Sequence, residues 1–161
     1  MKILKEILSY VVILIIVLFI KSYVVSPIRV NGDSMYNTLH DKDIMILNEF
    51  IYRFNDIKRF DIVVVEEEGE LLIKRVIGLP GEKIKCVDGN IYINDMKIDD
   101  KYSYSETNDF SAVTIEKDKY FVMGDNRKVS LDSRIYGTYT KRDIKGKASF
   151  TIYPFDRFGK R

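Results

Sequence analysis

The chain has 161 residues, of which 46% are hydrophobic and 31% are charged, which suits one folded domain with its own core. Its 26 basic and 24 acidic residues leave a formal net charge of +2, without a basic run of the kind that binds nucleic acid, so nucleic acid is excluded as an expected partner. The single cysteine, Cys86, excludes an intramolecular disulfide. One histidine without a cysteine–histidine cluster indicates no metal site.

The chain opens with an apolar run. Residues 7–20 are apolar except Ser9 and Tyr10, and the hydrophobic stretch reaches Val25 if the ammonium of Lys21 extends to the lipid interface. About 19 helical residues span roughly 28 Å, which is enough to cross a bilayer. We therefore expect residues 1–25 to form a single N-terminal transmembrane helix.

A cleaved signal peptide and a buried core helix are the alternatives for this run. Residues 23–25 are bulky, so no small-x-small cleavage site follows the apolar stretch. Lys2 and Lys5 favour a cytoplasmic amino terminus, although Lys21 and Arg29 on the other flank weaken that asymmetry.

The remainder, residues 26–161, contains short runs rich in β-branched and aromatic residues. They lie at residues 44–47, 62–65, 71–77, 83–87, 91–93, 113–115, 120–123 and 148–153. The dipeptide Asp88-Gly89 between two of these runs predicts a β-hairpin. Residues 100–109 are polar with interspersed aromatic residues and are interpreted as a surface loop. The pattern predicts a mainly β fold with an antiparallel sheet.

A lysine interrupts the apolar run at residues 71–77. In a strand, alternation places Leu72, Lys74 and Val76 on one face. Burial disfavours the charged form of a lysine, and a pKa lowered by roughly 2 units from about 10.4 yields neutral amine at mildly alkaline pH. Such an amine accepts a proton from a serine. The alternative is a structural lysine that reaches solvent at a strand edge or pairs with a glutamate.

A serine ends a second apolar track. If residues 28–35 are extended, Ile28, Val30, Gly32 and Ser34 share one face. Gly32 permits close approach of another backbone, so a peptide lying along this track would place its carbonyl near Ser34. Taken alone, a Gly-Asp-Ser sequence is more often a turn.

Polar side chains are dense between Gly124 and Arg134, directly after an apolar run. This density suits a hydrogen-bonded support for a functional site. It is also typical of a solvated loop with incidental ion pairs.

These segments resemble the signature boxes of type I signal peptidases. Ser34-Met35-Tyr36-Asn37-Thr38-Leu39 resembles the nucleophile box, and Lys74-Arg75-Val76-Ile77-Gly78-Leu79-Pro80-Gly81 resembles the lysine box. The run from Gly124 to Arg134 resembles the third signature, and Asp61-Ile62-Val63-Val64 resembles the strand box between the first two. The four boxes follow the family's order behind the apolar run, so the resemblance covers essentially the whole chain.

The resemblance implies a role for each matching residue. Ser34 is the expected nucleophile and Lys74 the expected general base, with Ser130 hydrogen-bonded to the lysine and with Asp132 and Arg134 supporting the site. The backbone N–H of Ser34 is expected to help form the oxyanion hole. Matching positions also indicate the walls of shallow pockets that admit small side chains, namely Ile28, Val30, Leu39 and Ile73.

Four residues in or beside the boxes need separate comment. Gly32 stands where some relatives supply a hydroxyl donor, as in the small Gram-positive type. Asn37 stands where the family usually has proline, and Phe60 where glycine commonly precedes the strand box. Since the lysine box is intact, His40 is expected to be a surface or loop residue and not the base.

The resemblance implies a membrane-bound serine endopeptidase that removes signal peptides from exported preproteins without a metal or cofactor. Its expected partners are preproteins and the lipid bilayer, with a cytoplasmic N-terminus and an extracytoplasmic peptidase domain at residues 26–161. One alternative is a self-cleaving Ser/Lys protease of the repressor type, but no DNA-binding helical module is evident. Another is a non-catalytic or single-substrate accessory protein for pilus or secreted-complex assembly.

The aromatic segment at residues 49–55 is expected either at the lipid interface or in the core.

Overall fold

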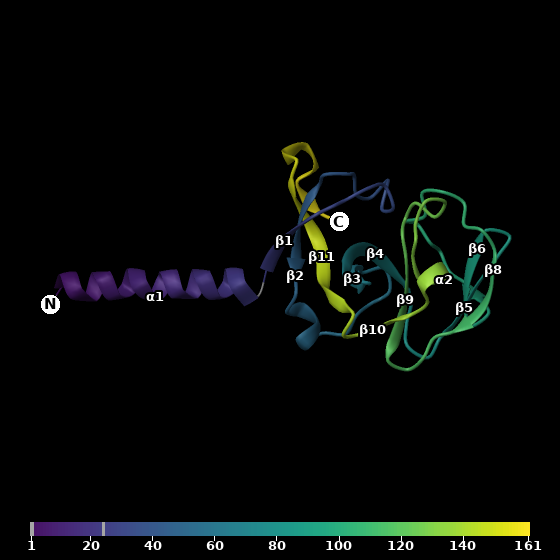
Figure 1. The fold of residues 1–161 in the computed structure, drawn as a ribbon, viewed down its shortest axis with the longest axis horizontal. Helices are drawn as coiled ribbons and strands as arrows, with labels where there is room; N and C mark the ends of the chain where they lie inside the picture. The colour runs from purple at the N-terminus through teal and green to yellow at the C-terminus, as the bar shows by residue number, and fades with distance from the viewer. Residues whose placement is uncertain (1, 24) are drawn as a thin grey trace.

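A long N-terminal helix precedes the β domain. A computed structural model describes the backbone of residues 2–23 and 25–161, and the side chains of these residues except 2, 4 and 18–23. Helix α1 (Lys2–Tyr23) projects away from the domain (Figure 1), and its described apolar side chains from Ile7 to Val17 are exposed. Among the residues that the structure describes, no helix meets the length and apolarity required to cross a membrane. The expected anchor includes Met1, Val24 and the side chain of Lys21, which lie outside the described residues.

Two antiparallel sheets make up the domain. The eight-stranded sheet has the order β1-β2-β11-β3-β4-β9-β10, with β12 paired to β11, and the four-stranded sheet has the order β7-β6-β5-β8. The larger sheet contains β1 (Val25–Arg29), β2 (Ile44–Asn48), β3 (Ile62–Glu67), β4 (Glu70–Gly78), β9 (Lys119–Met123), β10 (Tyr139–Thr140), β11 (Ile144–Tyr153) and β12 (Gly159–Lys160). The smaller sheet contains β5 (Lys83–Val87), β6 (Asn90–Ile93), β7 (Met96–Lys97) and β8 (Phe110–Thr114). The expected mainly antiparallel β fold is confirmed.

The sequence pattern explains the burial of β3 and the hairpin between β5 and β6. Strand β3 lies between β11 and β4, and its residues 62–65 are all buried because both faces of this strand are covered. The turn between β5 and β6 holds Asp88 at φ 49° and Gly89 at φ 73°. Two consecutive positive φ values are what a two-residue type I′ turn requires, so the predicted hairpin is confirmed.

Three apolar clusters fill the domain. The first lies behind the nucleophile box and contains Val30, Met35, Leu39, Met45, Leu47, Ile62, Val64, Ile73 and Ala148. The second packs β3, β4, β9, β10 and η1 (Ile51–Arg53) together, and the third joins β4 and β9 to the smaller sheet. Short helices complete the fold, namely α2 (Ser133–Tyr136) and η2 (Phe155–Arg157).

The track expected from Ile28 to Ser34 is not one extended strand. Strand β1 ends at Arg29, and Gly32 has a φ of 78°, which breaks the alternation. Ser34 therefore lies in a turn, the alternative that its Gly-Asp-Ser context also predicted.

The aromatic segment at residues 49–55 divides between the two expected environments. Tyr52 is buried, and its hydroxyl donates a hydrogen bond to Asp61 at 3.0 Å. Ile51 packs against the second apolar cluster, whereas Phe54 is 77% exposed.

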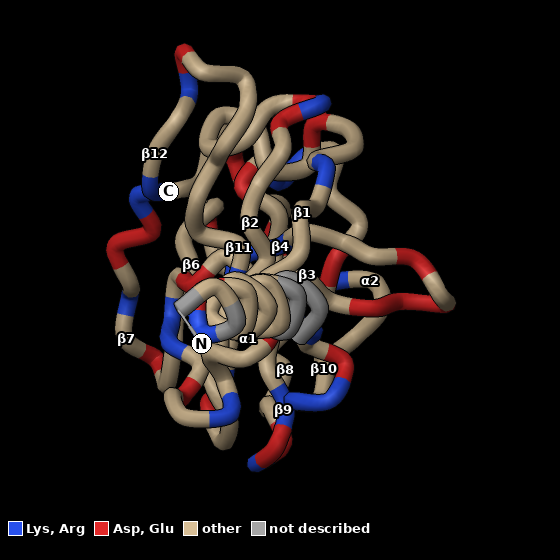
Figure 2. The backbone as a smooth tube through the Cα atoms, turned by 90° about the vertical axis from the view of Figure 1, so that its left-hand side faces the viewer, with Lys and Arg blue, Asp and Glu red and all other residues tan. Residues whose placement is uncertain are grey.

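When the domain is viewed along α1, basic and acidic residues are interspersed along its described loops (Figure 2).

Candidate active site

The nucleophile box forms a turn that the core holds in place. The N–H of Tyr36 donates to the carbonyl of Asp33 at 3.1 Å, and the N–H of Leu39 donates to the carbonyl of Met35 at 2.8 Å. Met35 and Leu39 are buried in the first apolar cluster. Because these two side chains fix the turn, Ser34 is presented half-buried at the edge of the core.

Lys74 reaches Ser34 from β4 of the larger sheet. It lies in β4, directly opposite Val63 of β3, and the residue is 3% exposed. Its Nζ lies 2.9 Å from Ser34 Oγ. The turn and the strand thus bring together two side chains that are 40 residues apart in sequence.

Burial sets the acidity of this lysine. Loss of hydration lowers the pKa of Lys74 to about 8, against the attraction of Asp132, which raises it. The positive charge of Arg134 lowers it further. At a pKa of about 8, roughly a tenth of the Lys74 amines are neutral at pH 7.

The third signature packs closely against the nucleophile turn. The N–H of Asn126 donates to the carbonyl of Ser34 at 3.0 Å. A Cβ on Gly124 would collide with the Ser34 carbonyl oxygen and with Ser130 Oγ. Only glycine permits this approach, because any side chain at position 124 would force the turn and the loop apart.

Asp132 and Arg134 stabilise that loop. The buried Asp132 caps α2 and accepts hydrogen bonds from the N–H of Gly124 at 3.0 Å and from Arg134 Nε and Nη2, both at 2.8 Å. Arg134 Nη2 also donates to the carbonyls of Arg127 and Ser130. Although burial acts to raise it, Arg134 and the N–H of Gly124 hold the pKa of Asp132 below its usual range. The segment is therefore a hydrogen-bonded support and not a solvated loop.

The hydrogen bond expected between Ser130 and Lys74 is not formed. Within the described residues, the buried Ser130 Oγ makes no hydrogen bond of good geometry, although its hydroxyl lies near enough to Asp132 to help lower the pKa of that carboxyl, and Lys74 Nζ donates to Ser34 Oγ instead. Ser130 nevertheless lies near Ser34 and Lys74, because Gly124 packs closely against both Ser34 and Ser130.

Two clefts meet at Ser34 and Lys74. The smaller, of about 140 Å³, includes Val30 and Ile73 among its walls. The larger, of about 450 Å³, shares Asn31, Ser34, Leu72 and Lys74 with the smaller and is also lined by Gly32, Asp33, Asn126, Val129, Leu131 and Tyr136. Neither cleft is lined by Ile28 or Leu39, which pack in the first apolar cluster behind the smaller cleft.

A buried ion pair next to the site was not anticipated from the sequence. Arg75 is 2% exposed and donates to both carboxylate oxygens of Asp125, at 2.8 and 2.6 Å. Asp125 also accepts from Thr38 Oγ1 at 2.5 Å. Alternation along β4 marks Arg75 as a residue on the face opposite Lys74, but nothing in the pattern identifies a partner 50 positions away.

The structure also shows the surroundings of Asn37 and Phe60, which depart from the family pattern, and of His40. The peptide bond between Tyr36 and Asn37 is cis. Phe60 has a φ of 70°, and its carbonyl accepts a hydrogen bond from Arg75 Nη1 at 2.9 Å. His40 is half-buried in a loop, as expected, with its ring edge-on to that of Tyr36.

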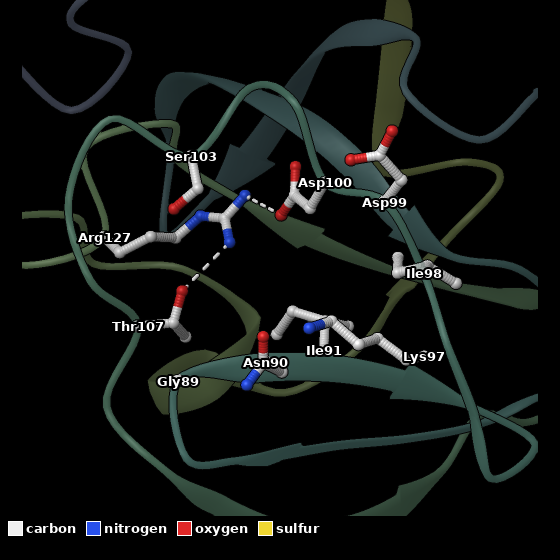
Figure 3. Close-up of a pocket in the computed structure, with 10 residues that line it drawn as sticks. All are labelled: Gly89, Asn90, Ile91, Lys97, Ile98, Asp99, Asp100, Ser103, Thr107 and Arg127. Carbon is white, nitrogen blue, oxygen red and sulfur yellow. Dashed lines mark hydrogen bonds and ion pairs between the residues drawn. The ribbon is translucent and has the colours of Figure 1, made fainter.

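A further cavity lies away from the dyad. It has a volume of about 480 Å³ between the smaller sheet and the loop at residues 98–107 (Figure 3), and none of the predicted site residues lines it. Within the described part of the chain, no cluster of three or more potential metal ligands occurs.

Comparisons with known proteins show which family the chain resembles over most of its length. A family model described as "Signal peptidase, peptidase S26" matches residues 3–153. "Signal peptidase I" of Bacillus amyloliquefaciens is 36% identical and covers 94% of this chain and 89% of its own length. "Signal peptidase IB" of Staphylococcus aureus is 32% identical, covering 98% and 93% respectively. The crystal structure of a signal peptidase I from Enterococcus faecalis is 31% identical with a TM-score of 0.53, covering 58% of this chain and 97% of that one.

Proposed function

This chain belongs to the peptidase S26 family of signal peptidases, and we propose that it cleaves signal peptides from exported preproteins with Ser34 as nucleophile and Lys74 as general base. The family membership makes it a serine peptidase, a hydrolase. The observation that carries the assignment of roles is the contact of 2.9 Å between Ser34 Oγ and the Nζ of a lysine that is 3% exposed.

Burial supplies the reactivity of the pair. Neutral Lys74 accepts the proton of Ser34 as Oγ attacks the scissile carbonyl and forms a new C–O bond. The intermediate collapses when the C–N bond breaks and Lys74 delivers its proton to the leaving amine. A water molecule then attacks the acyl-enzyme with Lys74 again as base, which restores the free serine. Arg134 and Asp132 hold the surrounding loop during both steps.

Stabilisation of the oxyanion is assigned to the backbone. The N–H of Ser34 is the proposed donor, and Gly32 offers no side chain as a second one. The bond from Asn126 to the Ser34 carbonyl orients the same peptide segment. Rigid donors suit this role because they need no reorganisation when charge develops.

The two clefts suggest how a substrate lies across the pair. The smaller cleft, of about 140 Å³, is the proposed site for the small residue before the scissile bond, with Val30 and Ile73 as walls. Ile28 and Leu39 pack behind these walls and limit the depth of the cleft. The larger cleft then receives the segment that departs with the leaving amine.

We assign membrane attachment to α1 (Lys2–Tyr23) and catalysis to the β domain, which begins one residue earlier than the expected boundary between residues 25 and 26 because Val25 already belongs to β1. Support comes from the exposed apolar side chains of α1 and from the exposed rings of Phe54, Phe155 and Phe158 on the domain. A cytoplasmic N-terminus would place the peptidase domain on the extracytoplasmic side, where exported preproteins emerge. Enzyme and substrate confined to one bilayer meet at a raised effective concentration.

The proposal is tested with the detergent-solubilised full chain and a set of preproteins that carry signal peptides. Wild-type protein should release the mature protein, and Ser34→Ala should abolish this release. Ser111→Ala, which changes an exposed serine in β8, is the matched control and should cleave normally. Undiminished cleavage by Ser34→Ala would refute the assignment. Cleavage of only one preprotein of the set would favour the single-substrate alternative.

A further inference from the structure

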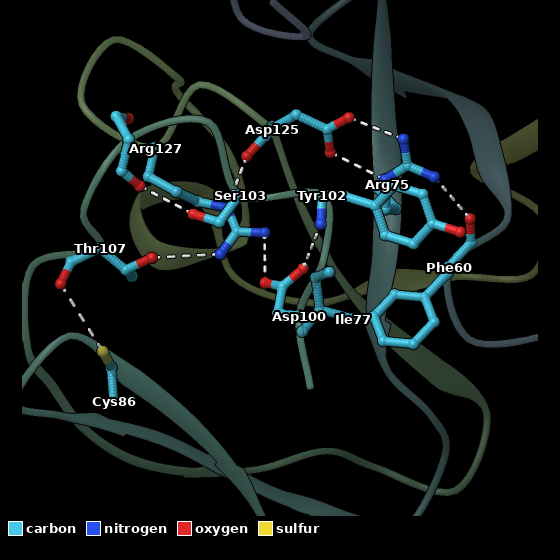
Figure 4. A network of polar contacts seen from close by, with 12 residues as sticks. Phe60, Arg75, Ile77, Cys86, Asp100, Tyr102, Ser103, Thr107, Asp125 and Arg127 are labelled. Carbon is cyan, nitrogen blue, oxygen red and sulfur yellow. Dashed lines mark hydrogen bonds and ion pairs between the residues drawn. The ribbon is translucent and has the colours of Figure 1, made fainter. Parts of the chain in front are cut away.

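One loop that lies outside the predicted signature boxes in the sequence contacts every segment that builds the dyad. Residues 100–107, here termed the strap, contain neither helix nor strand. They were expected to be a surface loop, and several of their side chains are exposed, yet their inner contacts are specific (Figure 4).

The strap covers the ion pair behind the catalytic lysine. The guanidinium carbon of Arg75 lies 3.7 Å from the centroid of the Tyr102 ring. Arg75 is 2% exposed while Tyr102 is 40% exposed, so the ring separates the guanidinium from solvent. Arg75 is the residue directly after Lys74, and a cation over an aromatic face gains most where water is excluded.

The middle of the strap contacts the nucleophile turn and the third signature. The N–H of Tyr104 donates to the carbonyl of Asp125 at 2.9 Å, and its ring packs edge-on against the ring of Tyr36 at 4.7 Å between centroids. Ser105 Oγ is hydrogen-bonded to Asn126 Oδ1 at 3.1 Å. Tyr36 lies two residues after Ser34, and Asn126 donates to the Ser34 carbonyl.

Both ends of the strap are fixed to one buried arginine. Arg127 Nη2 donates to Asp100 at 2.6 Å, with side-chain exposures of 0% and 9%. Arg127 Nη1 donates to Thr107 Oγ1 at 3.1 Å. These three residues form part of the wall of the cavity of about 480 Å³, where Figure 3 shows the arginine between the other two.

From these contacts we infer that the strap, with Tyr102 as its central positioning residue, holds Ser34 and Lys74 in register by keeping the Arg75–Asp125 pair dry. The inference rests on the proposed function. The attraction between two charges falls steeply when water reaches them. Through Thr38 and Asn126, this pair joins β4 to the nucleophile turn. A hydrated pair lets the turn shift, and proton transfer requires Ser34 Oγ within hydrogen-bond reach of Lys74.

Substitutions of Tyr102 test the inference on the full chain. Tyr102→Leu keeps an apolar side chain but removes the aromatic face, and should lower kcat roughly tenfold with KM nearly unchanged. Tyr102→Phe keeps the face and should retain wild-type kcat. Tyr92→Leu is the matched control, since Tyr92 in β6 lies near the cation of Lys85 in the smaller sheet and should leave both constants unchanged. Tyr104→Leu, which removes the contact with Tyr36, is a second variant with the same expected fall in kcat.

Amide hydrogen exchange gives a readout that does not depend on cleavage. The Asn126 N–H, bonded to the Ser34 carbonyl, should exchange faster in Tyr102→Leu than in wild type or Tyr92→Leu. Unchanged exchange together with unchanged kcat would overturn the role of the strap, as would a rise in KM alone. Undiminished cleavage by Ser34→Ala would refute the proposed function, whereas the exchange result would still decide the role of the strap.

Discussion

The pKa of Lys74 makes a quantitative prediction about catalysis. If neutral Lys74 is the base, kcat/KM follows its deprotonated fraction as pH rises. With the pKa at about 8, that fraction is about 1% at pH 6, about 9% at pH 7 and about 90% at pH 9. At the usual value of 10.5 it would be only about 0.03% at pH 7. We therefore expect kcat/KM to rise about tenfold from pH 6 to pH 7 and to level off above pH 9.

The assay measures initial rates of preprotein cleavage by the solubilised chain between pH 6 and pH 10. The substrate concentration stays well below KM so that the profile reports the free enzyme. Thermal unfolding followed at each pH confirms that the enzyme stays folded. A rate that keeps rising through pH 10, or one that is flat from pH 6 to pH 9, would refute a base with a pKa of about 8.

Three further predictions concern stability and packing. In the unfolded chain the pKa of Lys74 returns to near 10.5, above the folded value of about 8, so unfolding takes up a proton between these limits. Wild type should therefore gain up to about 3 kcal/mol relative to Lys74→Met as pH rises from about 8 to about 10.5, and parallel urea titrations would show whether that gain is missing. Gly124→Ala should lower kcat roughly a hundredfold, because its Cβ displaces Ser34 and Ser130, and a wild-type kcat would contradict this packing. Phe60→Gly should be more stable than Phe60→Ala by about 1 kcal/mol in urea unfolding, since both lose the ring but only glycine relieves the positive φ; equal stabilities would count against strain at this position.

Local patterns predicted the strands well for a physical reason. Every apolar run assigned to a strand overlaps one in the structure, because β-branched residues such as those of β3 are both good strand formers and buried. The hairpin followed from the positive φ that Asp88-Gly89 tolerates. The start of β1 was missed because Val25 was counted with the apolar helix, and the two-residue strands β7, β10 and β12 were missed because two residues are too few for any alternation to show.

The site was predictable where chemistry lies in the local sequence and not where it depends on distant contacts. Lys74 within an apolar strand indicated a buried amine, which the structure confirms at 3% exposure. Ser34 lies in a turn because the backbone at Gly32 has a positive φ. The prediction of one extended track from Ile28 to Ser34 did not allow for that change of direction. The Arg75–Asp125 pair and its cover by Tyr102 join three distant segments, so no short motif could reveal them.

The central claim is that Lys74 is a base and Ser34 a nucleophile that act as one unit, and substitution of Lys74 by arginine tests it most directly. A guanidinium stays protonated at any working pH, so Lys74→Arg keeps the charge but cannot accept a proton. Lys74→Arg, Lys74→Ala and Ser34→Ala should each lose nearly all preprotein cleavage while staying folded, and Ser34→Ala combined with Lys74→Ala should be scarcely worse than either alone. Substantial cleavage by Lys74→Arg with Ser34 intact would show that Lys74 is structural and would contradict the mechanism.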